Sequence, residues 1–204
     1  MITIVDYGLG NLESVKYALD RLGAASELTC DAGKIASAAG VILPGVGAFE
    51  RAMENLRALK LVDVLRSCAV SGRPFMGICL GAQLLLSRSE EYGLHPGLDI
   101  IRGQVKRFAH DLTVPHMGWN QVQQARPSPL FEGVRDNDFF YFAHSYYLAP
   151  ADETVVIGRT DYGGPYASAV QTGSVLGTQF HPEKSGPVGL RMLANFCRMC
   201  GQKA

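Results

Sequence analysis

A cysteine in the first half of the chain has the setting of a catalytic nucleophile. Cys79 stands between Gly77 and Gly81, in a G-x-C-x-G pattern with one glycine two residues to each side. Glycine lacks a side chain, so the backbone can turn sharply there and a strand can pack closely on a helix. This is the pattern of a nucleophile elbow, with cysteine in place of the more usual serine. A thiol at the first turn of a helix also lies near the positive end of the helix dipole, which favours the thiolate.

The same pattern has a plainer interpretation. Cys79 could be a buried structural cysteine between two glycines that serve only packing. A short motif is a hypothesis until its partner residues are found, so the choice depends on the rest of the chain.

Suitable partners for a thiol nucleophile occur near the end of the chain, in the run Q-F-H-P-E at positions 179–183. A thiol needs a base that takes its proton and returns it to the leaving group, and the base needs a carboxylate that fixes its tautomer. Cys79, His181 and Glu183 fit these three roles. Pro182 restricts the backbone at and before its own position, so one rigid turn can present the histidine and the glutamate together. Alone, the His-Pro-Glu run indicates only a turn, but combined with the elbow it predicts a catalytic triad.

Apolar residues indicate the elements that position these side chains. The run at 75–78 is too short for a helix and predicts a buried strand, whereas Leu80 and the leucines at 84–86 recur at helical spacing. The cysteine is therefore expected at an abrupt strand-to-helix turn. A second strand, predicted at 175–180, ends directly before the histidine.

The two motifs together resemble the class I, triad-type glutamine amidotransferases, which hydrolyse glutamine and pass the ammonia to a synthase. The matching runs are G-I-C-L-G-x-Q at 77–83 and Q-F-H-P-E at 179–183. Further segments narrow the resemblance to the glutaminase subunits of imidazole glycerol phosphate synthases: D-Y-G-x-G-N-L-x-S-V at 6–15, L-P-G-V-G-A-F at 43–49, P-H-M-G-W-N at 115–120, Y-F-x-H-S-Y at 141–146 and K-S at 184–185. The resemblance covers nearly the whole chain.

The resemblance implies both a fold and a reaction. It implies an α/β fold in which residues 1–204 form a single glutamine amidotransferase (glutaminase) domain around a mixed, mostly parallel central sheet. It implies hydrolysis of L-glutamine to glutamate and ammonia through a covalent thioester on Cys79, without a metal or other cofactor. In this family the chain forms a heterodimer with a cyclase subunit, which uses the ammonia to make imidazole glycerol phosphate and aminoimidazole carboxamide ribotide in histidine biosynthesis.

Other classes of protein remain as alternatives. Glutaminase subunits that serve pyridoxal phosphate, anthranilate or aminodeoxychorismate synthesis share the triad but not the segments at 6–15 and 115–120. A redox-sensing or protease-like elbow protein would keep the cysteine without the distant histidine and glutamate. A test of glutaminase activity separates this class from the others. A non-enzymatic binding module would require the triad to be accidental.

A P-G-V-G segment at 44–47 has the composition of a flexible backbone donor. Two glycines around one residue let a peptide plane rotate at little steric cost. An acyl-transfer site needs backbone N–H donors that face the tetrahedral intermediate. The resemblance makes this segment the oxyanion strand, and assigns the oxyanion hole to Val46, Gly47 and Leu80. Without the cysteine, a simple turn into a helix at 48–56 would be the better interpretation.

Candidate glutamine-binding residues follow from the same resemblance. Gln83 lies one helical turn after the cysteine on the same face, so its amide could meet the substrate, although alone it would be taken for a helix-surface glutamine. Ser145 and Tyr146 resemble the segment whose backbone holds the amino-acid end of glutamine, and Gly47 is a further contact. His144 is expected to be a hydrogen-bonded core residue.

The resemblance also assigns a set of residues to the cyclase interface: Asn11, Ser14, Trp119, Tyr141 and Lys184. Each has an ordinary alternative. Helix capping is the favoured account of the asparagine and the serine. Packing in the core could explain the two aromatic residues, and the lysine would otherwise be a solvated side chain.

Composition limits the other classes of function. The chain has 204 residues, 47% hydrophobic content, a formal net charge of zero and a pI near 6.9. This balance lacks the basic footprint of a nucleic-acid binder, no apolar run reaches the length of a membrane span, and no signal-peptide pattern is expected. The five cysteines are an odd number and scattered, which does not suggest a disulfide framework, so a cytoplasmic location is expected. Cys197 and Cys200 are expected to pack in a helix rather than bind zinc, because no second ligand pair accompanies them.

The other predicted helices and strands belong to one domain, because no Gly/Ser-rich linker separates the two halves of the chain. Helices are predicted at 12–22, 48–56, 61–71 and 188–199, and a loop at 90–103. Strands are predicted at 1–5 and 40–43, and strand-like segments joined by short turns at 103–108, 120–124, 139–142, 145–148, 154–160 and 167–171. We therefore expect one mixed sheet with helices on both faces and extra antiparallel strands.

Overall fold

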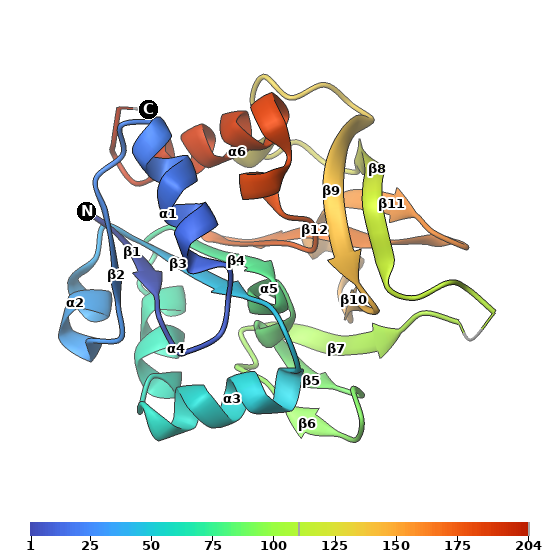
Figure 1. Cartoon of the computed structure of the whole chain (residues 1–204), viewed down its shortest axis with the longest axis horizontal. Helices are drawn as coiled ribbons and strands as arrows, with labels where there is room; N and C mark the ends of the chain where they lie inside the picture. The colour runs from blue at the N-terminus through green and yellow to red at the C-terminus, as the bar shows by residue number, and fades with distance from the viewer. Residues whose placement is uncertain (110, 204) are drawn as a thin grey trace.

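A mixed sheet runs through the molecule in the computed structural model, which describes residues 1–109 and 111–203 (Figure 1). Its central strands pair in parallel in the order β2 (Ser26–Thr29), β1 (Ile2–Val5), β3 (Gly40–Gly45), β4 (Phe75–Cys79) and β13 (Val175–Thr178). Every residue of β1, β3, β4 and β13 is buried, as in parallel strands that are covered on both faces. The predicted parallel core of the sheet is confirmed.

Beyond β13 the sheet continues mainly through antiparallel strands. They follow in the order β12 (Pro165–Thr172), β10 (Tyr146–Pro150), β7 (Ile101–Arg107), β5 (Leu86–Ser89) and β6 (His95–Pro96), with β5 and β7 parallel to each other. A branch leaves β12 through β11 (Val156–Asp161), β8 (His116–Gln124) and β9 (Asp138–His144). The last two form a ribbon away from the parallel strands (Figure 1). The extra antiparallel strands expected from the sequence are therefore present.

Helices cover both faces of the parallel strands (Figure 1). On one face lie α1 (Leu12–Arg21) and α6 (Gly186–Met199), and on the other lie α2 (Ala32–Ser37), α3 (Phe49–Ala58), α4 (Val62–Val70) and α5 (Leu80–Leu84). Successive residues of a strand point to opposite faces, so Met76 packs under α1 and α6, whereas Phe75 packs under the other helices. Short 3₁₀ helices at Pro129–Phe131, Glu153–Val155 and Pro182–Lys184 complete the described elements.

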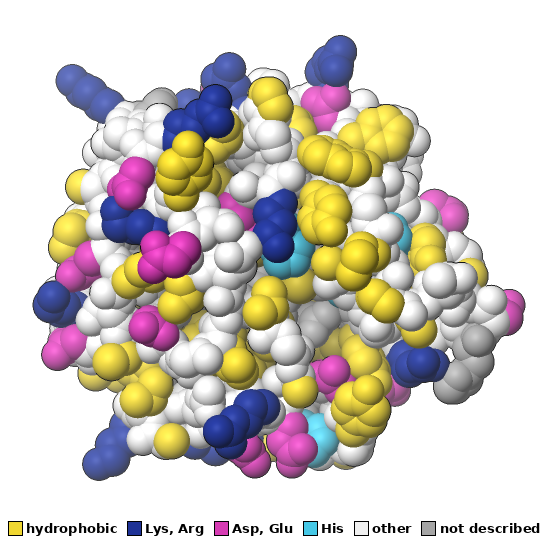
Figure 2. Space-filling view, viewed as in Figure 1, with side chains coloured by type: hydrophobic (Ala, Val, Ile, Leu, Met, Phe, Trp, Pro, Cys, Tyr) yellow, Lys and Arg dark blue, Asp and Glu magenta, His cyan; other side chains and the backbone are white. Residues whose placement is uncertain are grey.

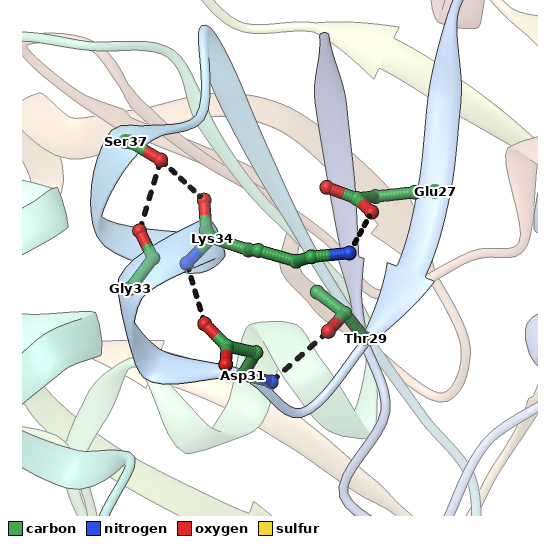
Figure 3. Close-up of polar contacts among 6 residues, drawn as sticks. All are labelled: Glu27, Thr29, Asp31, Gly33, Lys34 and Ser37. Carbon is green, nitrogen blue, oxygen red and sulfur yellow. Dashed lines mark hydrogen bonds and ion pairs between the residues drawn. The ribbon is translucent and has the colours of Figure 1, made fainter.

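The sequence pattern does not predict β2 or α2, and local polar contacts explain how they form (Figure 3). Asp31 caps α2, because its carboxylate accepts the N–H of Lys34 at 2.8 Å. The Lys34 ammonium reaches Glu27 on β2 at 2.9 Å. These contacts join α2 to the edge strand of the sheet, and such short polar elements carry little apolar periodicity.

β3 is longer than its apolar run predicts. The strand continues through Pro44 and Gly45, because its register with β4 pairs Gly45 with Cys79. The expected turn therefore begins two residues later, at Val46. This extension brings the segment at 44–47 directly beside the elbow.

The helix after the elbow is shorter than predicted. α5 ends at Leu84, and Leu86 already belongs to β5. The N–H groups of Ile100 and Ile101 both donate to the Leu85 carbonyl at 2.9 Å. Contacts from a later segment thus take over the backbone acceptor that a longer helix would use, and no local signal reveals this.

Other boundaries differ for the same kind of reason. The predicted loop at 90–103 contains β6 and the first residues of β7, so that prediction is wrong in part. β8 begins at His116 rather than Asn120, because it pairs with the whole length of β9. The segment predicted as a strand at 154–160 starts as the 3₁₀ helix Glu153–Val155.

Candidate active site

Cys79 lies where β4 ends and α5 begins, as the elbow pattern predicts. Its backbone has φ 54° and ψ −111°, outside the regions that residues with side chains prefer. Strain of this kind persists only when the surrounding structure imposes it, and it clusters at functional sites. The cysteine is 5% exposed, so the strained turn holds its thiol almost completely shielded from solvent.

The two flanking glycines are required by close packing. A Cβ atom on Gly81 would lie 1.7 Å from the carbonyl oxygen of Leu43 on β3. A Cβ atom on Gly77 would lie 2.7 Å from the backbone of Ala82 in α5. Neither distance is possible for real atoms, so the glycines allow β3, β4 and α5 to meet around the thiol.

Gly81→Ala is expected to lower the free energy of unfolding by about 3 kcal/mol, because the methyl group must push β3 and α5 apart. Urea denaturation of the purified chain measures this change. Gly33→Ala is the matched control, since its Cβ would meet only the flexible Asp31 carboxylate, at 3.2 Å. Equal and small changes for both variants would contradict the packing argument.

His181 and Glu183 stand on one turn after β13, which ends at Thr178 rather than at residue 180 as predicted, and this turn is the 3₁₀ helix that begins with Pro182. The histidine Nδ1 lies 2.8 Å from Glu183 Oε1, and the two side chains are 3% and 1% exposed. The N–H of His181 donates to the carbonyl of Tyr141 at 2.9 Å, and the Ser185 hydroxyl donates to the carbonyl of His181 at 2.6 Å. The ribbon of β8 and β9 thus helps to hold this turn.

The electrostatics of His181 depend on Cys79. Burial opposes the charged imidazolium, but the Cys79 thiolate and the Glu183 carboxylate, both hydrogen-bonded to the ring, raise the pKa of His181 to about 10. Because Nδ1 faces the glutamate, Nε2 is the nitrogen left for the sulfur. The three side chains are therefore arranged as a nucleophile, a base and an orienting carboxylate, which is the arrangement of acyl-transfer chemistry through a thiol.

The thiol faces a cavity of about 380 Å³, within the size range of small-molecule sites. Every residue predicted for the oxyanion hole or for glutamine binding lines it: Val46, Gly47, Leu80, Gln83, Ser145 and Tyr146. Gly47 has φ 102°, a conformation that favours glycine, and Leu80 is the first residue of α5, where the N–H has no partner within the helix. Leu80 therefore offers a backbone donor next to the cysteine, and Gly47 lies on the wall of the same cavity.

Comparison with known proteins agrees with this geometry. A family model described as glutamine amidotransferase class-I matches residues 3–200. The chain belongs to the class I glutamine amidotransferases. Its curated relatives include the imidazole glycerol phosphate synthase subunit HisH of Moorella thermoacetica, which is 55% identical over 195 residues, 96% of this chain and 93% of the relative. The subunit of the same name from Aquifex aeolicus is 46% identical over 196 residues, 96% of this chain and 95% of the relative.

Solved structures show the same fold at low sequence identity. A structure titled glutamine amidotransferase aligns with a TM-score of 0.78 at 22% identity, over 99% of this chain and 100% of that one. The PurLQS structure from Thermotoga maritima aligns with a TM-score of 0.77 at 17% identity, over 97% of each chain. The predicted fold class, a single-domain class I amidotransferase fold, is therefore confirmed.

The predicted interface residues of the amidotransferase lie mostly on its surface. Hydrophobic side chains gather over β8 and β9 (Figure 2), and the large exposed ones on these strands are Met117, Trp119 and Phe139. Trp119 is 55% exposed, so it is no core anchor. Its ring packs edge-on against half-buried Tyr141, whose ring in turn lies 6.5 Å from that of His181. This surface thus adjoins the catalytic turn, where Lys184 is also exposed.

The two predicted interface residues at the start of α1 do not cap this helix. Asn11 occupies the N-cap position, but its side chain accepts no capping hydrogen bond, and Ser14 lies inside the helix. The favoured account of these residues as helix caps is therefore wrong. Both are partly exposed at the N-terminus of α1.

Four residues near the amidotransferase site were missed by the sequence reasoning. Glu91 and Arg107 line the cavity with opposite charges, which suits the amino and carboxylate groups of an amino acid. Gln179 lies against the thiol, and Ser185 supports the catalytic turn. The latter two fall inside recognised motifs, so proximity to the triad was an available signal. Glu91 and Arg107 lie in unremarkable segments and carried none.

Other candidate features contribute no further site. The described part of the chain holds no group of three or more His, Cys, Asp or Glu residues that could bind a metal ion. Cys197 is buried in α6, and Cys200 follows the end of that helix. Within residues 1–109 and 111–203, no helix has both the length and the apolar character needed to cross a membrane.

Proposed function

We propose that the chain is the glutaminase subunit of an imidazole glycerol phosphate synthase. The observation that carries the chemistry is the strained Cys79 turn, which faces the buried His181–Glu183 pair at the edge of a cavity of about 380 Å³. Relatives that are 45–55% identical over nearly the whole chain carry the name of this subunit, which favours it over the glutaminases of pyridoxal phosphate, anthranilate or aminodeoxychorismate synthesis. We propose one domain over residues 1–204, in the cytoplasm.

The proposed reaction proceeds through a thioester. The Cys79 thiolate attacks the side-chain amide carbon of L-glutamine and forms a tetrahedral intermediate. The His181 imidazolium gives its proton to the leaving nitrogen, the C–N bond breaks, and ammonia departs. His181, now neutral, takes a proton from water, whose oxygen attacks the thioester carbon. The C–S bond breaks, glutamate leaves, and the thiolate is restored, while Glu183 keeps the ring in one tautomer throughout.

The negative charge on the intermediate needs backbone donors. We assign this role to the N–H of Leu80 and to the peptide between Val46 and Gly47. The register of β3 with β4 supports the assignment, because it places Gly45 opposite Cys79 and hence the next peptides beside the sulfur. In the cavity, Gln83, Ser145 and Tyr146 would hold the amino-acid part of glutamine.

The ammonia requires a receiving partner, and we propose a cyclase subunit that docks near β8 and β9. The exposed side chains of Met117, Trp119 and Phe139 form an apolar surface next to the catalytic turn. Exposed aromatic and Met side chains are enriched at protein interfaces. With Asn11, Ser14, Tyr141 and Lys184, they are the proposed contacts.

Isotope transfer tests this function. The chain is mixed with a purified cyclase and its ribulosyl aminoimidazole substrate, and glutamine labelled with ¹⁵N in the side-chain amide is supplied. The proposal requires the label in imidazole glycerol phosphate and co-elution of the two chains on size exclusion. Release of labelled ammonia without incorporation would leave a glutaminase but refute the assigned partner.

The glutaminase is expected to be nearly idle alone, and to accelerate about 100-fold to 1,000-fold when the cyclase and its substrate are present. That range is the effect of one oxyanion donor, and rotation of the flexible peptide at Gly47 could supply it. Gly47→Val should blunt the acceleration, because a β-branched residue resists φ 102°.

Gly201→Val is the control for this experiment. Gly201 also has a positive φ, of 75°, with open space around its Cβ position, but it follows α6 and does not line the cavity. Glutamate release with and without the partner is measured for each variant. Full activity of the isolated wild-type chain, unchanged by the cyclase, would disprove the switch.

A further inference from the structure

A continuous chain of hydrogen bonds runs from the sulfur of Cys79 to the ribbon formed by β8 and β9. The amide nitrogen of Gln179 lies 3.9 Å from the sulfur of Cys79, a long but possible contact for a sulfur acceptor. The amide oxygen of Gln179 accepts from Gln83 Nε2 at 3.1 Å, and the same nitrogen donates to the carbonyl of Tyr146 at 2.9 Å. Both glutamines are nearly fully buried, so these partners determine how their amides point.

The direction of the Gln179 amide follows from its neighbours. The Tyr146 carbonyl can only accept, so Gln83 must turn its NH₂ group toward it. The second hydrogen of that NH₂ group then needs an acceptor, which is the oxygen of Gln179. The NH₂ group of Gln179 is left to face the sulfur of Cys79, where it favours the thiolate because a hydrogen bond to the charged form stabilises it.

On the other side of Tyr146 the chain of hydrogen bonds continues through His144. Nδ1 of this histidine lies 2.7 Å from the Tyr146 carbonyl, so Nδ1 carries the proton. Burial lowers the pKa of His144 to about 3, which keeps the ring neutral and Nε2 without a proton. Nε2 is therefore an acceptor.

The hydroxyl of Tyr166 lies 3.2 Å from this nitrogen, and His116 supplies a second donor. Its Nδ1 lies 3.2 Å from Nε2 of His144, and its Nε2 lies 3.2 Å from the amide nitrogen of Asn120. The Asn120 NH₂ group also donates to the Asp161 carbonyl at 2.9 Å, so His116 Nε2 accepts and Nδ1 bears the proton. Burial lowers the pKa of His116 to about 4, and this ring is neutral as well. The tautomers of both rings are thus determined by fixed donors and acceptors.

We propose that Gln179 is a positioning residue for the Cys79 thiolate, and that the neutral His116–His144 pair holds the backbone and amide groups that aim it. This inference rests on the proposed glutaminase function and deepens it. Gln179 does not line the cavity, whereas Gln83 does. The loss of Gln179 should therefore act on the reactivity of the sulfur and on kcat, and leave KM nearly unchanged.

Gln179→Met tests the proposal, because methionine has a similar volume and no N–H donor. The full chain is treated with iodoacetamide at pH 7, alone and bound to the cyclase, and the modified Cys79 peptide is quantified by mass spectrometry, which separates it from exposed Cys30. We expect the alkylation rate of Cys79 to fall about tenfold, the effect of a lost hydrogen bond to a charged group. kcat for glutamine should fall by a similar factor.

The histidine pair gives a second, independent arm. His144→Phe keeps an aromatic ring among Phe108, Phe142 and Tyr166 but removes the donor to Tyr146, and should slow alkylation about threefold. His144→Asn, whose amide nitrogen can replace Nδ1, should stay within about twofold of wild type. This rescue distinguishes aiming of the amide from mere filling of the core.

Ser168→Ala is the control for both arms. Ser168 is fully buried and accepts a hydrogen bond from Thr160, but its hydroxyl is not part of the chain of hydrogen bonds. In this variant, Cys79 should be alkylated at the wild-type rate. The inference would be overturned if Cys79 were alkylated at the wild-type rate in folded Gln179→Met, or at identical rates in the two His144 variants. Absence of glutamine hydrolysis in wild type, with the alkylation differences intact, would instead overturn only the proposed function.

Discussion

Replacing Cys79 by alanine is expected to abolish glutamine-dependent synthesis by the complex, with a decrease of roughly 10⁴-fold or more in kcat. Cys79 is the only cysteine in the described part of the chain that lines the cavity, so its loss removes the covalent pathway there. The cyclase should still work when ammonium is added, because its chemistry needs only ammonia. Product formation with glutamine and with ammonium, measured on one preparation, separates these two activities.

A matched buried cysteine controls for packing. Cys68 is 2% exposed, and its sulfur lies 3.6 Å from the carbonyl of Ile35, away from the cavity. Cys68→Ala should keep both activities. If the Cys79→Ala complex retained glutamine turnover, the assignment of the nucleophile would be wrong.

Removal of His181 should lower kcat nearly as much as removal of Cys79 does, because members of a catalytic unit act together and the effects of removing them do not add. His181→Ala leaves the thiol without a proton acceptor and the leaving nitrogen without a proton. Glu183→Gln should be milder by about a hundredfold, because the ring loses only part of its orientation. Glutamate release under saturating glutamine measures both variants in the complex.

The pH profile gives a sharper readout for Glu183. This carboxylate is one of the groups that raise the pKa of His181, so Glu183→Gln should lower that pKa and move the alkaline limb of the activity profile to lower pH. Glu50→Gln is the control, because Glu50 pairs with His95 at 3.4 Å on the surface. Small and equal effects at both glutamates would show that the His-Pro-Glu run is merely a turn.

Features encoded within short stretches could be predicted. The strand, turn and helix around Cys79 follow from a short apolar run, two glycines and helical spacing, and the structure places β4 and α5 accordingly. His181 and Glu183 share one turn because Pro182 restricts it. By contrast, the end of α5 depends on N–H groups of Ile100 and Ile101, which come from another part of the sheet. Interactions of that kind have no local signal, which also explains the missed start of β8.

By itself, the sequence determined which residues could form a triad, because residue type and spacing set the chemistry of a thiol, an imidazole and a carboxylate. Only the tertiary structure decided that they meet. The parallel register of β4 with β13, which pairs Gly77 with Gly177, brings the carboxyl ends of two distant strands to one edge of the sheet. The same long-range pairing sets which groups surround the sulfur. Glu91 and Arg107 acquire their positions in the cavity from the tertiary fold, which sequence spacing does not encode.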